Sequence, residues 1–155
     1  MALIGLISDV HASAQPVAEA MAIFEREGVD RILCAGDIAG YMDQLDETID
    51  LLIDNNCLTV MGNHDLQHLD KNPDDSRAVT FLSALPATFE ETIAGKRLYM
   101  VHAKPPDGHP NSHIHGGIKL LDKTGSIIPE RLAYWSHTLQ DFDADVLIIG
   151  HTHQV

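Results

Sequence analysis

Basic residues are scarce in this sequence. Lys and Arg together number 10 against 23 Asp and Glu, which gives a formal net charge of −13 at pH 7. Because binding to polyanions depends on clustered Lys and Arg, this balance argues against nonspecific binding to nucleic acid or to anionic lipid. No apolar run approaches the roughly 20 residues that span a bilayer. The apolar start, Met1–Ile7, has no preceding basic residues of the kind that open a signal peptide, so we expect a cytoplasmic protein with no membrane partner.

Aromatic residues and cysteines are also few. Aromatics make up 5% of the chain while hydrophobic residues make up 45%, so the core must be mainly aliphatic. The two cysteines, Cys34 and Cys57, sit in aliphatic stretches and are expected to be buried free thiols of a reducing compartment. At 155 residues, without repeat or linker, the sequence predicts a single domain over residues 1–155. Histidine, by contrast, is abundant, with 10 residues.

The first half of the chain alternates between two apolar patterns. Runs of strand length occur at Ala2–Ser8, Arg31–Ala35 and Leu58–Met61. Between them, apolar residues recur at helical spacing over residues 17–24 and 45–53. This order predicts right-handed crossovers and a parallel sheet.

The second half predicts a different arrangement. A helix is expected over Ser76–Leu85, where Pro86 stops it. The remaining expected elements are an antiparallel hairpin of Thr88–Ile93 and Arg97–Val101, an irregular loop over 103–117, a helix at Pro129–Gln140 and a strand at Val146–Ile149. The predicted class is therefore α/β with antiparallel additions.

Polar residues of the kinds that bind metals follow five of the predicted strands. In isolation each motif has an ordinary explanation as a helix cap, a turn or a half-buried histidine. Together they indicate a ligand-binding site, because the carboxyl ends of strands in an α/β sheet form the crevice where ligands bind. The five segments are Ser8-Asp9-Val10-His11, Gly36-Asp37, Gly62-Asn63-His64-Asp65, His102 and Gly150-His151-Thr152-His153.

The number of donors in these segments suits two cations. One ion would be held by Asp9, His11, Asp37 and His153, and the other by Asn63, His102 and His151 with Asp37 as a bridge. Two cations about 3.5–4 Å apart form the clamp of two-metal phosphoryl chemistry. Since all these donors are N or O, with no thiolate, they suit divalent Mn, Fe or Zn.

The five motifs, D-x-H, G-D-x-x-G, G-N-H-D, a separate His and G-H-x-H, resemble those of the calcineurin-like metallophosphoesterase family, in the family's order. The short spacings are most similar to the small prokaryotic phosphodiesterase branch. The Arg that follows G-D in the protein phosphatases is absent, because Ile38 stands there.

The resemblance implies a four-layered α/β/β/α sandwich with a dinuclear site. It implies two divalent ions, with Mn preferred and Fe, Zn, Ni or Co as alternatives, and a phosphodiesterase that hydrolyses a phosphoester by a metal-bridging hydroxide. Under this resemblance His64 is the acid beside the leaving group, Asp65 orients it, and Asn63 and His64 contact the substrate.

Two features depart from the family pattern. Members usually continue past G-H-x-H with further strands of the second sheet, whereas this sequence stops at Val155. We expect either a longer natural product or completion of the sheet by a partner chain, including a homo-oligomer. The loop at 103–117 carries His109, His113 and His115, and is either a solvated loop or a lid on the substrate, with Lys104 as a cationic helper.

Three functions remain open on the sequence. The leading one is a phosphoesterase for a small substrate, favouring a phosphodiester monoanion because few Lys or Arg flank the motifs. The second is a binding or scaffold module on the same fold without turnover, although a scaffold would have no need of an intact His64 and Asp65. The third is a metal-storage or metal-sensing protein.

Overall fold

Three parallel strands form the first sheet, in the order β1 (Ile4–Ile7), β2 (Arg31–Cys34) and β3 (Leu58–Thr59). The computed structural model describes residues 1–73 and 76–153. The connections run through α1 (Ala14–Glu27) and α2 (Leu45–Asp54), so the predicted strand–helix alternation is confirmed. Gly28 ends α1 in the left-handed conformation, at φ 67°, which glycine adopts at little cost.

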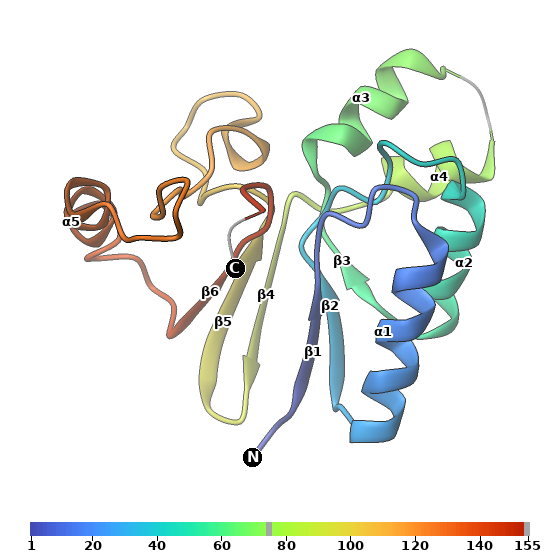
Figure 1. The fold of residues 1–155 in the computed structure, drawn as a ribbon, viewed down its shortest axis with the longest axis horizontal. Helices are drawn as coiled ribbons and strands as arrows, with labels where there is room; N and C mark the ends of the chain where they lie inside the picture. The colour runs from blue at the N-terminus through green and yellow to red at the C-terminus, as the bar shows by residue number, and fades with distance from the viewer. Residues whose placement is uncertain (74–75, 154–155) are drawn as a thin grey trace.

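The second sheet faces the first (Figure 1) and has mixed strand directions. Strands β4 (Thr88–Ile93) and β5 (Lys96–Val101) form the predicted antiparallel hairpin. Strand β6 (Val146–Ile148) adds to β5 in parallel, pairing Leu98 with Val146. A segment from the end of the described chain is therefore hydrogen-bonded to the middle of the sequence.

Helices cover the outer faces of both sheets, which gives the four layers of an α/β/β/α sandwich (Figure 1). On one side lie α1 and α2, together with α4 (Arg77–Ser83). On the other side lies α5 (Pro129–Thr138), none of whose residues is fully buried. The predicted architecture is confirmed, with one thick and one thin helical layer.

Two helical segments were not predicted. The motif Gly62-Asn63 looks like a turn in the sequence, but α3 (Asn63–Lys71) begins there, and a short 3₁₀ turn, η1 (Ser112–Ile114), lies in the loop at 103–117. Helix α3 is polar, so no apolar periodicity indicates it. Its start is stabilised by Asp65, whose carboxylate accepts the N–H of Gly62 at 2.8 Å.

Strand β2 separates two apolar cores. Between the helices and the first sheet, the buried side chains include Val17, Met21, Cys34, Ile49, Leu52 and Leu82. Between the two sheets they include Leu33, Ala35, Val60, Leu98 and Met100. Because successive side chains of a strand point to opposite faces, Leu33 and Cys34 enter different cores. Cys34 and Cys57 are free thiols, as predicted, but only Cys34 is buried, whereas Cys57 is partly exposed.

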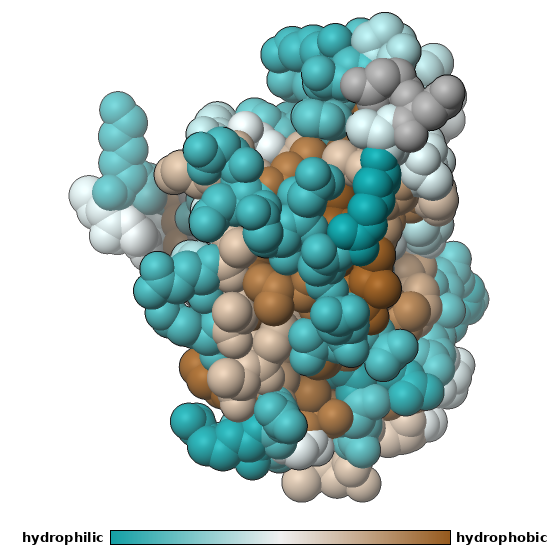
Figure 2. Space-filling view, turned by 90° about the vertical axis from the view of Figure 1, so that its right-hand side faces the viewer, coloured by the Kyte–Doolittle hydropathy of each residue, from teal (hydrophilic) through white to brown (hydrophobic). Residues whose placement is uncertain are grey.

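Solvent reaches part of the apolar surface on the helical side. Figure 2 shows that face with apolar side chains lying between hydrophilic ones. The exposed large apolar residues include Ile23 of α1 and Ile53 of α2. Across the described ranges, no helix combines the length and the apolar character needed to cross a membrane.

Candidate metal centre

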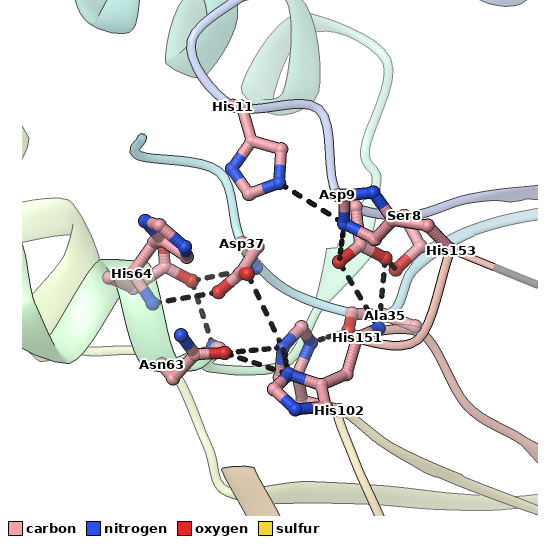
Figure 3. A network of polar contacts seen from close by, with 12 residues as sticks. Ser8, Asp9, His11, Ala35, Asp37, Asn63, His64, His102, His151 and His153 are labelled. Atoms are coloured by element: carbon pink, nitrogen blue, oxygen red, sulfur yellow. Dashed lines mark hydrogen bonds and ion pairs between the residues drawn. The ribbon is translucent and has the colours of Figure 1, made fainter. Parts of the chain in front are cut away.

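The five polar motifs meet at one end of the two sheets, and Figure 3 shows their side chains converging. The loop after β1 carries Asp9 and His11, and the loop after β2 carries Asp37. The start of α3 carries Asn63 and His64, His102 follows β5, and His151 and His153 follow β6. The structure therefore brings together all seven side chains that the sequence proposes as metal ligands.

Backbone hydrogen bonds hold these loops in place. The N–H of Asp9 donates to the carbonyl of Gly36 at 2.9 Å, and that of His11 donates to the carbonyl of Asp37 at 3.0 Å, so the first two loops run side by side. From the second sheet, the N–H of His151 donates to Asp9 Oδ2 at 3.0 Å. The site thus joins the ends of both sheets.

The backbone is strained at the same place. Nine non-glycine residues in the described ranges have positive φ, and five of them are proposed ligands: Asp9, His11, Asp37, His151 and His153. Side chains larger than glycine disfavour this conformation, and it persists where the surrounding structure imposes it, often at functional sites. Because five strained residues converge on one place, a ligand-binding site explains them better than five unrelated turns do.

The donor atoms form three overlapping groups, within each of which they lie within 4.8 Å of one another. The groups are Asp9, His11 and His153; His11, Asp37 and His64; and Asp37, His102 and His151. In Figure 3, Asp37 stands between His64 on one side and Asp9 and His153 on the other. This central place suits a carboxylate shared by two ions.

An amide oxygen completes the third group. Asn63 Oδ1 lies 3.1 Å from His102 Nε2 and 2.9 Å from His151 Nδ1. These two imidazole nitrogens are themselves 3.2 Å apart. Three donor atoms so close together, from the start of α3 and from the segments that follow β5 and β6, are arranged as they would be around one cation.

Two backbone carbonyls determine which nitrogen each buried imidazole presents to the site. His102 Nδ1 lies 2.6 Å from the carbonyl oxygen of Ala35, and His11 Nδ1 lies 3.2 Å from that of Ala39. Since a carbonyl oxygen only accepts, each Nδ1 carries the hydrogen, and in the neutral ring Nε2 keeps its lone pair. Histidines that bind metals are typically oriented in this way, so the donor set fits divalent ions.

Burial and charge shift the pKa values of these groups in different directions. Burial lowers the pKa of His11 and that of His151. Burial also acts to lower the pKa of His102, but the hydrogen bond and charge of Asp37 outweigh it and the net shift is upward. For Asp37, burial acts to raise the pKa, yet its bond to His102, 3.4 Å away, makes the net shift downward. Without an ion, Asp37 and His102 therefore stabilise each other's charged forms.

Glycine at position 62 is needed because the backbone passes close to Asp37. A Cβ atom there would lie 2.2 Å from Asp37 Oδ1, nearer than any real contact allows. The N–H of His64 donates to the same oxygen at 2.8 Å. The glycine of the third motif thus allows α3 to begin against the carboxylate of the second.

Asp65 lies beneath the site and is fully buried. Its carboxylate oxygens accept the backbone N–H groups of Asp37 at 3.1 Å, Ala39 at 2.8 Å and Gly62 at 2.8 Å. Burial raises its pKa to about 6. The sequence predicts that Asp65 orients His64, but the contacts of this carboxylate are with the backbone of two loops, and so it supports them.

The imidazole of His64 lies beside Tyr41, a residue that the sequence motifs do not include. The hydroxyl of Tyr41 lies 3.4 Å from His64 Nε2. The only signal for Tyr41 in the sequence is its place directly after the G-D-x-x-G motif.

The loop at 103–117 is partly closed on itself. Lys104 Nζ donates to Asp107 at 2.5 Å, and this ion pair lowers the pKa of the Asp107 carboxyl well below its usual range. The carbonyl of His113 accepts the N–H of Ala103 at 2.8 Å, while His109 and His115 are exposed. The charge of Lys104 is thus compensated within the loop, which weakens its case as a cationic helper.

Comparisons with known proteins agree with the motifs. The calcineurin-like phosphoesterase superfamily domain matches residues 2–155. An uncharacterised protein of Methanocaldococcus jannaschii is 27% identical over 175 residues, a match that covers 97% of this chain and 62% of that protein. The chain therefore spans less than two thirds of the length of that relative.

Two solved structures share the fold. A metallophosphoesterase from Sphaerobacter thermophilus has 25% identity and a TM-score of 0.65, covering 97% of this chain and 60% of that one. A hypothetical protein from Pyrococcus horikoshii has 16% identity and a TM-score of 0.64, covering 96% and 69%. With the family domain matching almost every residue and its motifs converging on one site, the chain belongs to the calcineurin-like phosphoesterase superfamily.

Proposed function

We propose that this chain is a dinuclear metal-dependent phosphoesterase that hydrolyses phosphodiesters. The observation that carries the proposal is that Asp37 shares one group of donors with His11 and another with His102 and His151, while His11 also belongs to the group of Asp9 and His153. The resemblance to the family makes manganese the ion we expect, and the N and O donor set also suits Fe, Zn, Ni or Co. When bound, two such ions would supply an activated water and would neutralise charge on the phosphoryl oxygens.

The residues of the chain have separate tasks in this reaction. The buried imidazoles of His11 and His102 direct Nε2 into the site, and the strained loops hold the carboxylates in position. We assign His64 the transfer of a proton to the leaving oxygen, because its ring lies beside the bridging carboxylate and is held at the start of α3. We also assign Asn63, at the first position of the same helix, contacts with both an ion and the phosphate.

The charge of the molecule favours a small substrate. A formal net charge of −13 repels extended polyanions, whereas a phosphodiester adds only one negative charge to the site. Lys104, the basic residue that the sequence offers as a helper, is paired with Asp107. We therefore propose a small phosphodiester as substrate, and a protein without nonspecific affinity for nucleic acid.

The direct test is an assay of the purified protein on bis-p-nitrophenyl phosphate and on p-nitrophenyl phosphate. The protein is first stripped with a chelator and then given Mn²⁺, Zn²⁺ or Mg²⁺. We expect turnover of the diester that depends on the added ion and exceeds turnover of the monoester. Stoichiometric ion uptake without turnover of either ester would favour a binding or storage protein and would contradict the proposal.

A further inference from the structure

Tyr41 stands at the mouth of the site, in contact with two of its imidazoles. Its ring centroid lies 4.4 Å from that of His11 and 4.9 Å from that of His64, the latter in an edge-to-face arrangement. His11 and His64 meet each other at 4.8 Å. The three rings therefore form one cluster on the Asp37 side of the metal centre.

Backbone contacts of the neighbouring residues fix the position of Tyr41. The N–H of Met42 donates to the carbonyl of His11 at 3.1 Å, and that of Gln44 donates to the carbonyl of Ala12 at 3.2 Å. Gly40 precedes Tyr41 at φ 152°, and a Cβ there would lie 2.3 Å from His11 Nδ1. The segment is thus pressed against the first motif, and Tyr41 has little freedom to move away from it.

Burial in the core does not explain why a tyrosine lies at this position. Tyr41 is 68% exposed, whereas His11 beside it is 6% exposed. An exposed tyrosine on an ordinary surface directs its hydroxyl to water. Here the hydroxyl lies 3.4 Å from His64 Nε2, a nitrogen for which the described part of the chain offers no other hydrogen-bond partner.

We propose that Tyr41 is a leaving-group residue of this site: its hydroxyl and His64 Nε2 form a pair of donors for the departing oxygen of the phosphoester. Two groups 3.4 Å apart can both reach a single oxygen atom placed between them. The tyrosine ring also limits the rotation of the imidazole. The inference rests on the proposed function, because it needs a leaving group beside His64.

The proposed step is the hydrolysis of the bond between phosphorus and the leaving oxygen. Water adds its oxygen to phosphorus while the bond from phosphorus to the leaving oxygen breaks. His64 gives that oxygen a proton, the attacking water releases a proton to solvent, and the imidazole is protonated again from solvent after the alcohol leaves. Tyr41 donates a hydrogen bond to the developing alkoxide and keeps its own proton, so its help grows with the negative charge on the leaving oxygen.

The test compares Tyr41→Phe, which removes only the hydroxyl, with wild type on methyl phosphodiesters whose leaving groups run from p-nitrophenol through phenol to an alcohol. Tyr134→Phe is the matched control, since Tyr134 is 62% exposed and lies on α5, away from the site. For Tyr41→Phe we expect kcat to fall about tenfold on the alcohol ester, the loss of one good hydrogen bond, and less than about twofold on the nitrophenyl ester, with KM little changed. Because the help of Tyr41 grows with the negative charge on the leaving oxygen, and that charge is larger without the acid, Tyr41→Phe should cost at least as much in the His64→Asn background as in wild type.

A second measurement does not depend on activity. In the metal-free protein, long-range ¹H–¹⁵N spectra should show a shifted Nε2 resonance of His64 in Tyr41→Phe and an unshifted one in Tyr134→Phe. The inference is overturned if that resonance does not move, if the loss is the same for all leaving groups, or if Tyr41→Phe has no further effect in the His64→Asn background. Absence of turnover by metal-loaded wild type on the whole series would overturn the proposed function, and this inference with it.

Discussion

Asp37 is the residue on which both proposed ions depend. Its Oδ1 accepts the N–H of His64 at 2.8 Å and its Oδ2 lies 3.4 Å from His102 Nε2, so its two oxygens face different parts of the site. We expect Asp37→Ala to lose the whole metal cluster, because the shared carboxylate offsets the repulsion between two cations. Asn63→Ala, which removes one neutral donor, should retain about one ion per chain. Elemental analysis after gel filtration measures both, and retention of both ions by Asp37→Ala would contradict the bridge.

His64 should matter most when the leaving group is a strong base. An alkoxide needs a proton to depart, whereas p-nitrophenolate scarcely does, and a general acid contributes typically 10²–10⁴-fold. We therefore expect His64→Asn to keep its metals and to lose rate by about that factor on alkyl phosphodiesters, but by less than about tenfold on nitrophenyl esters. Measurements of kcat for wild type and His64→Asn on both types of ester test this expectation. Equal losses with the metals in place would make His64 a residue that positions the phosphate.

The pair of Asp37 and His102 makes stability depend on pH when no metal is bound. The pKa of His102 is raised above 6.5, so its charged form stabilises the fold below pH 6.5, and this contribution is lost as the pH rises through the folded-state value. In the presence of EDTA, the gap in urea midpoint between wild type and His102→Asn should therefore narrow as the pH rises above 6.5. His137→Asn, at an exposed position on α5, is the control. A gap that widens with pH would contradict the charged pair.

At the scale of elements, Asp65 joins the loop after β2 to the start of α3. Its carboxylate accepts three backbone N–H groups, from Asp37, Ala39 and Gly62, and the side chain is fully buried. We expect Asp65→Ala to lower the free energy of unfolding by about 3 kcal/mol even without metal, since it leaves buried donors unsatisfied. Asp70→Ala, an exposed acid on the same helix, should change it by less than about 0.5 kcal/mol. Chemical denaturation in EDTA measures both, and an Asp65→Ala protein as stable as wild type would show that the carboxylate has no structural role.

For the whole molecule, metal binding should act as a clamp between the two sheets. The first donor group joins the loop after β1 to the segment after β6, and the third joins the loop after β2 to the segments after β5 and β6. At an ion concentration about 100 times the dissociation constant, binding should add about 2.7 kcal/mol to the free energy of unfolding. For a chain of this size that is a rise in Tm of about 5–10 °C. Differential scanning calorimetry with and without chelator tests this, and Asp37→Ala should show no rise.

Most of the elements could be predicted because each depends on neighbours in the sequence. The apolar run of Arg31–Ala35 lies within one residue of β2, and the hairpin of β4 and β5 begins and ends where its turn residues indicate. Helix α3 could not be predicted in this way. Its apolar residues are only Leu66 and Leu69, too few to indicate a helix, and its start depends on the approach of Gly62 to Asp37, a residue 25 positions earlier in the chain. Strand β3 ends at Thr59, before its predicted end at Met61, although the N–H of Val60 still donates to the carbonyl of Cys34 in β2.

The sequence by itself determined the candidate ligands, since carboxylates, imidazoles and an amide after successive strands must gather at one edge of an α/β sheet. The tertiary structure decided how these side chains are used. The carbonyls of Ala35 and Ala39 select the nitrogen that His102 and His11 present, and two N–H groups from the distant loop after β2 donate to Asp65. Tyr41, and not Asp65, lies beside the imidazole of His64. Such contacts join residues far apart in the chain, and their geometry depends on how two sheets and their loops pack, which no local pattern of residues encodes.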